Sequence, residues 1–202
     1  MAEQLPGNFY EGIKPRLHRR IGRELRVARR VLDLGCGSCE LVRYLASAHG
    51  QEVTGVDIAG DGFPSGGHPP GGARFRCLKG DAAKLGFLKD GAVDAVVTVW
   101  ALHEMEHPEA ILRGAYRVLR PGGEMLIVDF PRDSLAQTFW NEDYYRPDDI
   151  KALLQEAGFE KAHVRLIEHE QVLWARGYRP WSARDESPEL RRQTGADLKA
   201  QR

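Results

Sequence analysis

The sequence predicts an α/β fold in which a mainly parallel sheet carries helices on both faces. Short apolar runs typical of strands alternate along the chain with segments whose apolar residues recur at helical spacing. In addition, two glycines, Gly35 and Gly37, join the first of these runs directly to a helix. Glycine is suited to such a sharp turn because it has no Cβ to clash with the backbone or with a ligand.

The glycine turn also predicts where a ligand binds. The strand before it covers residues 31–34 and includes Asp33, and the helical pattern after it begins near residue 41. A strand that ends in glycines against a helix N-terminus leaves backbone N–H groups aimed at one point, which suits an anionic group or a carboxylate. We therefore expect a small-molecule site at the carboxyl end of this strand, where open α/β sheets usually bind ligands.

The remaining elements follow in regular order. A second strand within 51–58 places Asp57 at its tip, where an acid can accept hydrogen bonds from a ribose diol. The other expected elements are a helix within 1–30, strands over 74–77, 93–99 and 124–130, helices over 108–119 and 148–158, and extended segments over 161–167 and 171–176.

Five short motifs, in this order and spacing, resemble the class I S-adenosylmethionine (SAM)-dependent methyltransferases. The similarity is greatest to the branch with small-molecule and quinone-biosynthesis enzymes, and it extends from about Phe9 to about Tyr178. The motifs are Leu-Asp-Leu-Gly-Cys-Gly at 32–37, Gly-Val-Asp at 55–57, Gly-Asp-Ala at 80–82, Asp-Ala-Val-Val at 94–97 and Leu-Arg-Pro-Gly-Gly at 119–123. The resemblance implies a Rossmann-like, doubly wound sheet of seven mainly parallel strands with helices on both faces, whose last strand is antiparallel.

The same resemblance implies an enzyme that transfers a methyl group from SAM to an acceptor, which we expect to be a small molecule, by in-line displacement at a sulfonium. Asp33 would hold the methionine end of the cofactor, Asp57 its ribose, and Ile58 and Asp81 its adenine. Each of these residues also has a structural interpretation as a turn, a cap or core packing. The full set of expected cofactor residues is Tyr10, Asp33, Gly35, Cys36, Gly37, Asp57, Ile58, Asp81, Ala82 and Val99. No metal is expected.

His103 is the best candidate for a general base, because it follows the fourth strand and histidine titrates near neutral pH. Glu104 is a second choice, and an equal alternative is that His103 only positions the acceptor. Aromatic residues near this point suit a flat or apolar acceptor, although a satellite core under a loop would also explain them. The expected acceptor-binding residues are Trp100, His103, Phe139, Trp140, Tyr144 and Tyr145.

We expect one methyltransferase domain over 1–179, with an N-terminal helical cap segment over 1–30 and a substrate-lid connection over 131–147. A polar, mobile tail follows over 180–202. Glycine and proline occupy nine of the fourteen positions in 59–72, which excludes a regular helix there. A surface loop is favoured over a flap that closes on ligand.

Composition limits the partners and the location. Acidic and basic residues balance at 29 each, so nucleic acid is not favoured, although Lys and Arg are frequent over 14–30. No apolar run approaches the roughly 20 residues of a membrane span. The three cysteines predict no disulfide framework and favour the cytoplasm. The sequence does not indicate the oligomeric state.

Three other functions remain to be weighed. A nicotinamide-dependent oxidoreductase would need glycine where the chain has Glu40. A thiol redox protein would explain the Cys-x-x-Cys pair, Cys36 and Cys39, but none of the later motifs. A methyltransferase-like regulatory subunit without catalysis, or an RNA or protein methyltransferase, is the remaining alternative.

Overall fold

A computed structural model describes residues 8–64 and 74–181 of the chain. Most of the predicted Gly/Pro loop (65–72 of 59–72) and nearly all of the predicted tail lie outside these ranges. Within them, no helix combines the length and the apolar character needed to cross a membrane.

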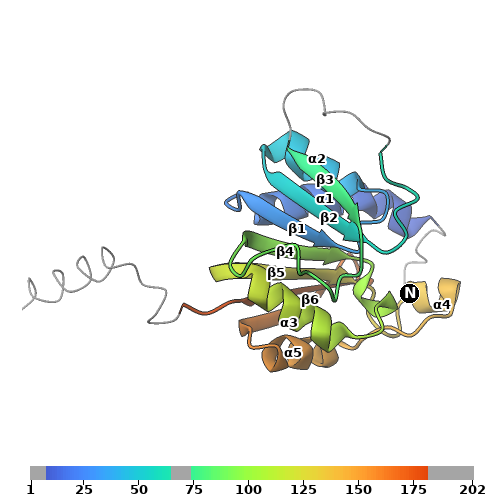
Figure 1. The fold of residues 1–202 in the computed structure, drawn as a ribbon. Helices are drawn as coiled ribbons and strands as arrows, with labels where there is room; N and C mark the ends of the chain where they lie inside the picture. The colour runs from blue at the N-terminus through green and yellow to red at the C-terminus, as the bar shows by residue number, and fades with distance from the viewer. Residues whose placement is uncertain (1–7, 65–73, 182–202) are drawn as a thin grey trace, which may run out of the picture.

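In the described part of the chain, seven strands form one sheet, as predicted (Figure 1). Their order is β3-β2-β1-β4-β5-β7-β6, and all neighbours from β3 to β5 are parallel. Only β7 runs in the opposite direction, because it pairs antiparallel with both β5 and β6. The strands are β1 (Arg30–Leu34), β2 (Glu52–Asp57), β3 (Phe75–Lys79), β4 (Val93–Val99), β5 (Leu119–Asp129), β6 (Glu160–Ile167) and β7 (Val172–Tyr178).

Helices cover both faces of the sheet. In Figure 1, α1 (Phe9–Glu24) and α2 (Glu40–His49) lie on one side, and α3 (Pro108–Val118) and α5 (Pro147–Glu156) on the other. A short helix, α4 (Leu135–Trp140), forms within the lid segment, where the sequence predicted only a connection. One turn of 3-10 helix, η2 (Leu102–Glu104), follows β4.

The alternation of side chains along each strand divides the interior into two cores. Val97 packs in the core under α1 and α2, whereas its neighbour Val96 packs in the core under α3 and α5. Val31 and Leu32 of β1 divide in the same way, as the period of two in a strand requires. A strand in the middle of such a sheet must be apolar on both sides, which is why these segments read as continuous apolar runs.

Several strand limits differ from the sequence prediction, most of all the start of β5. β5 begins at Leu119 instead of Glu124, because its Pro-Gly-Gly stretch is held against the end of β7. Gly122 N donates a hydrogen bond to the carbonyl of Arg179 (2.8 Å), and Arg179 N donates to the carbonyl of Gly123 (2.9 Å). β3 is shifted toward Lys79 relative to the prediction.

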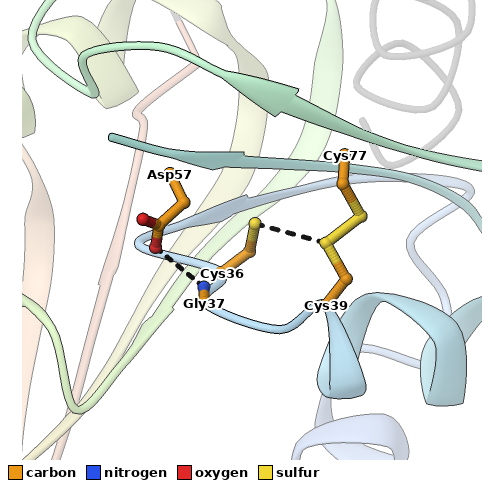
Figure 2. Close-up of a disulfide and its surroundings, with 5 residues drawn as sticks. All are labelled: Cys36, Gly37, Cys39, Asp57 and Cys77. Atoms are coloured by element: carbon orange, nitrogen blue, oxygen red, sulfur yellow. Dashed lines mark hydrogen bonds between the residues drawn. A yellow bond between two sulfur atoms is a disulfide. The ribbon is translucent and has the colours of Figure 1, made fainter. Parts of the chain in front are cut away.

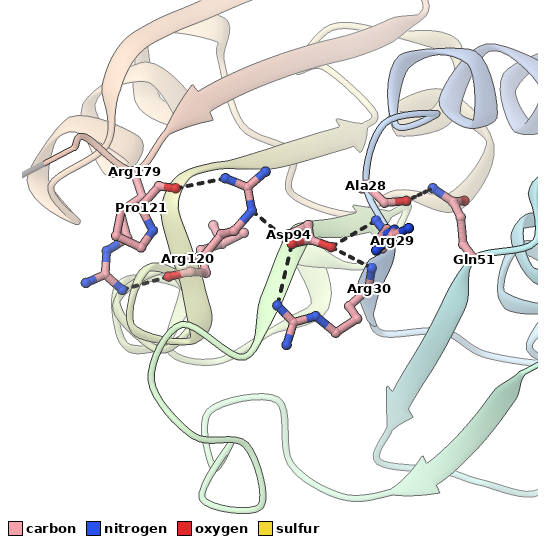
Figure 3. A network of polar contacts seen from close by, with 9 residues as sticks. Ala28, Arg29, Arg30, Gln51, Asp94, Arg120, Pro121 and Arg179 are labelled. Carbon is pink, nitrogen blue, oxygen red and sulfur yellow. Dashed lines mark hydrogen bonds and ion pairs between the residues drawn. The ribbon is translucent and has the colours of Figure 1, made fainter. Parts of the chain in front are cut away.

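Asp94 connects three strands at the amino end of the sheet (Figure 3). Its Oδ2 accepts hydrogen bonds from the backbone N–H groups of Arg29 (2.9 Å) and Arg30 (2.8 Å), and its Oδ1 accepts from Arg120 Nε (2.9 Å). Burial by itself raises the pKa of Asp94, but these hydrogen bonds and the nearby positive charge outweigh it and hold the pKa below its usual range. The carboxylate therefore stabilises the junction of β1, β4 and β5.

We expect Asp94→Asn to lower the free energy of unfolding by about 1.5–3 kcal/mol at neutral pH, because charge-assisted hydrogen bonds are lost. A lowered folded-state pKa gives stability that is present above the unfolded pKa of about 3.9 and is lost as the pH falls through the folded value. Urea denaturation should therefore show the difference between variant and wild type shrinking at acid pH. Asp90→Asn is the control, since Asp90 contacts Arg117 at the surface; an equal loss there would contradict the assignment.

Candidate active site

A cavity of about 560 Å³ lies at the carboxyl ends of the parallel strands, where the sequence predicted a ligand site. Elements far apart in the sequence meet there, from the glycine turn after β1 to the segment after β4. Its lining includes Asp33, Gly35, Cys36, Gly37, Asp57, Ile58, Asp81, Ala82, Val99, Trp100 and Glu104. Tyr10, alone among the predicted cofactor residues, is not part of the lining.

Both glycines of the turn have a positive φ, which glycine adopts without strain, and at Gly35 the space for a Cβ is also missing. Gly35 has φ +71°, and a Cβ there would overlap the side chain of Ala101, which follows β4. Gly37 has φ +48° and open space where a Cβ would project. Cys39, the N-cap residue of α2, also adopts a left-handed φ of +63° although it carries a side chain.

Asp57 is held in place by the glycine turn. Its Oδ2 accepts a hydrogen bond from Gly37 N (2.8 Å), and its Oδ1 accepts one from Ala59 N (2.9 Å). Each carboxylate oxygen can accept a further bond, so the group can still receive hydroxyl donors. Ile58, next in the chain, leaves 75% of its surface exposed at the cavity, which is unusual for a large apolar side chain.

Asp33 is buried to 2% exposure at the cavity wall. Burial first, and the negative charge of Asp57 second, raise the pKa of Asp33 to about 8. Among the described residues, no group donates a hydrogen bond to its Oδ1. An unsatisfied buried carboxyl oxygen beside a cavity is suited to a ligand that carries a cationic donor.

Asp81, which follows β3, lines another part of the cavity wall. Its Oδ1 accepts a hydrogen bond from Ala83 N (2.8 Å), and its Oδ2 lies 3.3 Å from Lys84 Nζ. The hydrogen bond from Ala83 and the contact with Lys84 lower the pKa of Asp81. Ala82, next to Asp81, and Val99, at the end of β4, also line the cavity.

The sequence predicted no disulfide framework, and the structure contains a single disulfide. Cys39 and Cys77 form a disulfide between the start of α2 and the middle of β3 (Figure 2). Cys36 is the remaining thiol, with its Sγ 3.6 Å from that of Cys39. The sequence could not reveal this pairing, since it depends on β3 lying beside β2 at the edge of the sheet.

His103 is held between carboxylates rather than facing the cavity. Its Nδ1 lies 2.7 Å from Asp129 Oδ1, and its Nε2 lies 3.3 Å from Glu142 Oε2 and 3.8 Å from Glu104 Oε1. Only 3% of its side chain is exposed. Burial by itself lowers the pKa of His103, but the hydrogen bond and charge of Asp129, with Glu104 and Glu142, outweigh it and keep the pKa above its ordinary value.

Aromatic rings surround Phe130, which follows β5. Trp100 stacks on Phe130 with ring centroids 5.2 Å apart, and Trp140 lies at the same distance in a tilted arrangement. Tyr144 and Tyr10 contact Phe130 edge-on. Because Trp100 also lines the cavity, this aromatic cluster adjoins it.

Trp100 has a strained backbone at the point where the cavity and the cluster meet. Its φ of +54° is rare for a bulky residue, and its indole Nε1 has no hydrogen-bond partner among the residues that the structure describes. Strain of this kind persists only where the surrounding structure enforces it, and it is concentrated at functional sites.

The other predicted acceptor and cofactor residues are divided between different surroundings. Phe139 and Trp140 on α4 are 45% and 48% exposed, whereas Tyr144 is buried against His103. Tyr145 instead packs with the core under α3 and α5. The Tyr10 hydroxyl donates to Gln171 Oε1 (3.3 Å) and accepts from Ala136 N (2.9 Å), so Tyr10 joins α1 to the lid segment.

Sequence reasoning missed Asp129, Phe130 and Glu142. One available signal was that Asp129 ends a strand, as Asp57 does, and carboxyl ends of parallel strands meet at one edge of a sheet. Glu142 had no comparable signal, since its place depends on how the lid segment folds back toward His103.

The family described as "Methyltransferase domain" matches residues 32–127. The ubiquinone/menaquinone biosynthesis C-methyltransferase UbiE of Ectopseudomonas mendocina is 30% identical over 194 residues, which cover 77% of this chain and 75% of that protein. The demethylmenaquinone methyltransferase of Thermus thermophilus is 35% identical over 115 residues, covering 51% of this chain. The match spans only 48% of that relative's length.

A solved structure shares the fold. The crystal structure of a SAM-dependent methyltransferase from Archaeoglobus fulgidus aligns with a TM-score of 0.70 at 23% identity, over 83% of this chain and 93% of that one. The domain match, the identity to UbiE over three quarters of its length and the shared fold agree with the motifs. This chain belongs to the class I SAM-dependent methyltransferases.

Proposed function

We propose that this enzyme methylates a flat, aromatic small molecule and takes the methyl group from SAM. The observation that carries the proposal is the aromatic cluster around Phe130, which adjoins the cavity at Trp100. Aromatic rings bind flat ligands through large apolar contacts at low entropic cost. Relatives named for quinone biosynthesis support the same class of acceptor.

The cavity suits the cofactor of this family. Asp33 offers a buried, unsatisfied oxygen to a cationic amino group, and Asp57 offers its remaining acceptor capacity to ribose hydroxyls. Ile58 would cover the adenine face, with Asp81 and Ala82 at its edge. When bound, SAM supplies a methyl group already activated on a sulfonium, so the protein's own contribution is orientation and exclusion of water.

His103 is proposed to act at the acceptor, with Asp129 as its positioning residue. Asp129 holds Nδ1, which leaves Nε2 as the nitrogen directed toward Glu142. An acceptor hydroxyl that takes the place of Glu142 would give its proton to Nε2 or be oriented by it. Glu104 remains the second candidate, because it lines the cavity and lies near the same nitrogen.

Nucleic acid is a less favoured acceptor because the basic face of α1 is partly engaged within the chain. Lys14 pairs with Glu40 (2.6 Å), Arg16 pairs with Glu168 (2.9 Å), and the Arg20 guanidinium lies over the Trp174 ring. Cations in such contacts are less available to phosphates.

The domain limits and the location stay predictions. We propose one domain over 1–179 with 131–147 as an acceptor lid, since α4 and Tyr144 from that segment reach the aromatic cluster. We also propose a cytoplasmic location, because three cysteines with one disulfide do not make the dense disulfide framework typical of small secreted domains.

Asp57→Asn should weaken S-adenosylhomocysteine binding by about 1.5–3 kcal/mol, the range for a hydrogen bond to a charged group. Isothermal titration calorimetry measures this directly. The matched control is Asp61→Asn, which changes a nearby acid outside the cavity lining and should bind as the wild type does. Equal affinity in both variants would remove the ribose assignment.

An acceptor screen tests the proposed reaction. Hydroquinones, catechols and aliphatic amines are incubated with enzyme and SAM, and products gaining one methyl group are detected by mass spectrometry. We expect methylation of aromatic hydroxyl or ring-carbon acceptors only. Trp140→Ala should raise KM for them without changing the affinity for S-adenosylhomocysteine. Cofactor binding without turnover on any acceptor class would favour a regulatory subunit.

The pH profile tests the role of His103. If His103 accepts the proton, kcat/KM of the wild type rises with pH through an apparent pKa above about 6.5, since base catalysis needs neutral imidazole. Asp129→Asn removes the charge that raises this pKa, so the profile should shift to lower pH. His103→Asn should lower kcat by about 10²- to 10⁴-fold, while its affinity for S-adenosylhomocysteine stays that of the wild type. An unshifted profile in Asp129→Asn would leave His103 only a positioning role.

A further inference from the structure

The disulfide joins two walls of the cofactor cavity. Cys39 is the N-cap residue of α2 and directly follows Gly37 and Ser38, which line the cavity on the glycine-turn side. Cys77 lies in β3, the strand that leads to Asp81 and Ala82 on the other side (Figure 2). Asp57 is hydrogen-bonded to Gly37 of the glycine turn. A ligand that reaches from Asp57 to Asp81 therefore contacts both of the cavity walls that the Cys39–Cys77 bond connects.

Among the described residues, β3 is hydrogen-bonded to the sheet along one side. It is the edge strand there and pairs with β2 alone, and none of its residues is fully buried, although Phe75 and Cys77 pack against the core. The end of β3 is tied to the cavity by the hydrogen bond from Gly80 N to the carbonyl of Asp57 (2.9 Å). A covalent link from Cys77 to α2 limits how far this edge can move.

The chain that follows Asp57 touches both walls as well. Gly62 lies close to Ser38, since a Cβ on Gly62 would be 3.3 Å from Ser38 Cα. Gly60 lies close to the Lys79 side chain, since a Cβ on Gly60 would be 3.1 Å from Lys79 Cδ. The position of this part of the wall thus depends on how the glycine turn and β3 are placed relative to each other.

The third cysteine does not compete for the bond. Burial first, and the charges of Asp33 and Asp57 second, raise the pKa of Cys36, so it remains a protonated thiol. Because the thiolate is the attacking species in exchange, Cys36 is a poor nucleophile toward Cys39 despite the 3.6 Å between their sulfurs.

We propose that the Cys39–Cys77 bond is a reversible disulfide through which small thiols and disulfides set the affinity of the cavity for its cofactor. The oxidised form holds the two walls in position for binding. Reduction frees the edge strand, so that part of the binding free energy is spent on ordering it again. This inference rests on the proposed cofactor cavity.

Dithiothreitol, a dithiol, supplies the two electrons that reduce the Cys39–Cys77 disulfide. A thiolate of dithiothreitol attacks the half-buried Cys77, the disulfide breaks, and Cys39 leaves as a thiolate that takes a proton. The second thiol of the reagent then displaces Cys77, which also leaves with a proton, and the reagent becomes a cyclic disulfide. Glutathione disulfide reverses the change by accepting two electrons and two protons from Cys39 and Cys77.

The test is titration with S-adenosylhomocysteine of the full chain, oxidised with glutathione disulfide or reduced with dithiothreitol. Iodoacetamide labelling and mass spectrometry count the free thiols in each sample. We expect two additional labelled cysteines after unfolding the reduced sample, and a Kd at least about threefold higher than in the oxidised one. Circular dichroism checks that both samples are folded.

Two variants test which cysteine is responsible for the change in affinity. Cys77→Ser should bind as weakly as the reduced wild type in both buffers. Cys36→Ser should keep the ratio between oxidised and reduced affinities, whatever its absolute value. Equal Kd values for the oxidised and reduced wild type would overturn the proposal while leaving the cavity assignment intact. Absence of S-adenosylhomocysteine binding in both forms would instead overturn the cavity assignment, and the inference with it.

Discussion

The contact of Gly35 with Ala101 is the constraint on which the site depends. Only a residue without a Cβ lets the turn after β1 lie against the segment after β4. This contact brings the cofactor cavity next to Trp100 and His103, at the point where the strand order reverses between β1 and β4. A larger residue at position 35 would separate the binding half of the site from its acceptor half.

Three aspartates at or beside the carboxyl ends of strands show how different surroundings give one residue type different functions. Asp57 is held by two backbone N–H groups, whereas Asp33 is buried with an unsatisfied oxygen and a pKa raised to about 8. Asp129 is bound to His103 Nδ1. Two carboxyl groups are thus prepared for a ligand and one for orienting an imidazole, which is the way enzymes divide acid and base work among similar groups.

Much of the site could be predicted from local sequence because its residues follow strand ends, which are legible as apolar runs closed by glycine or an acid. Gly37 and Asp57 were predicted in this way, Asp81 was predicted from the family resemblance, and the structure brings all three to one cavity. The surroundings of Tyr10 and Tyr145 could not be predicted, since each depends on the path of the lid segment. Tyr144 and Tyr145 are adjacent in sequence yet pack in different cores.

The sequence by itself determined the class of fold, the two-sided apolar strands and the order of the methyltransferase motifs, because these depend on periodicity and on residues close together in the chain. Tertiary structure alone decided that Cys39 bonds to Cys77, 38 residues away, and that His103 meets Asp129, 26 residues away. These pairings depend on which strands become neighbours and in what register. Side-chain patterns along one segment carry no record of that arrangement.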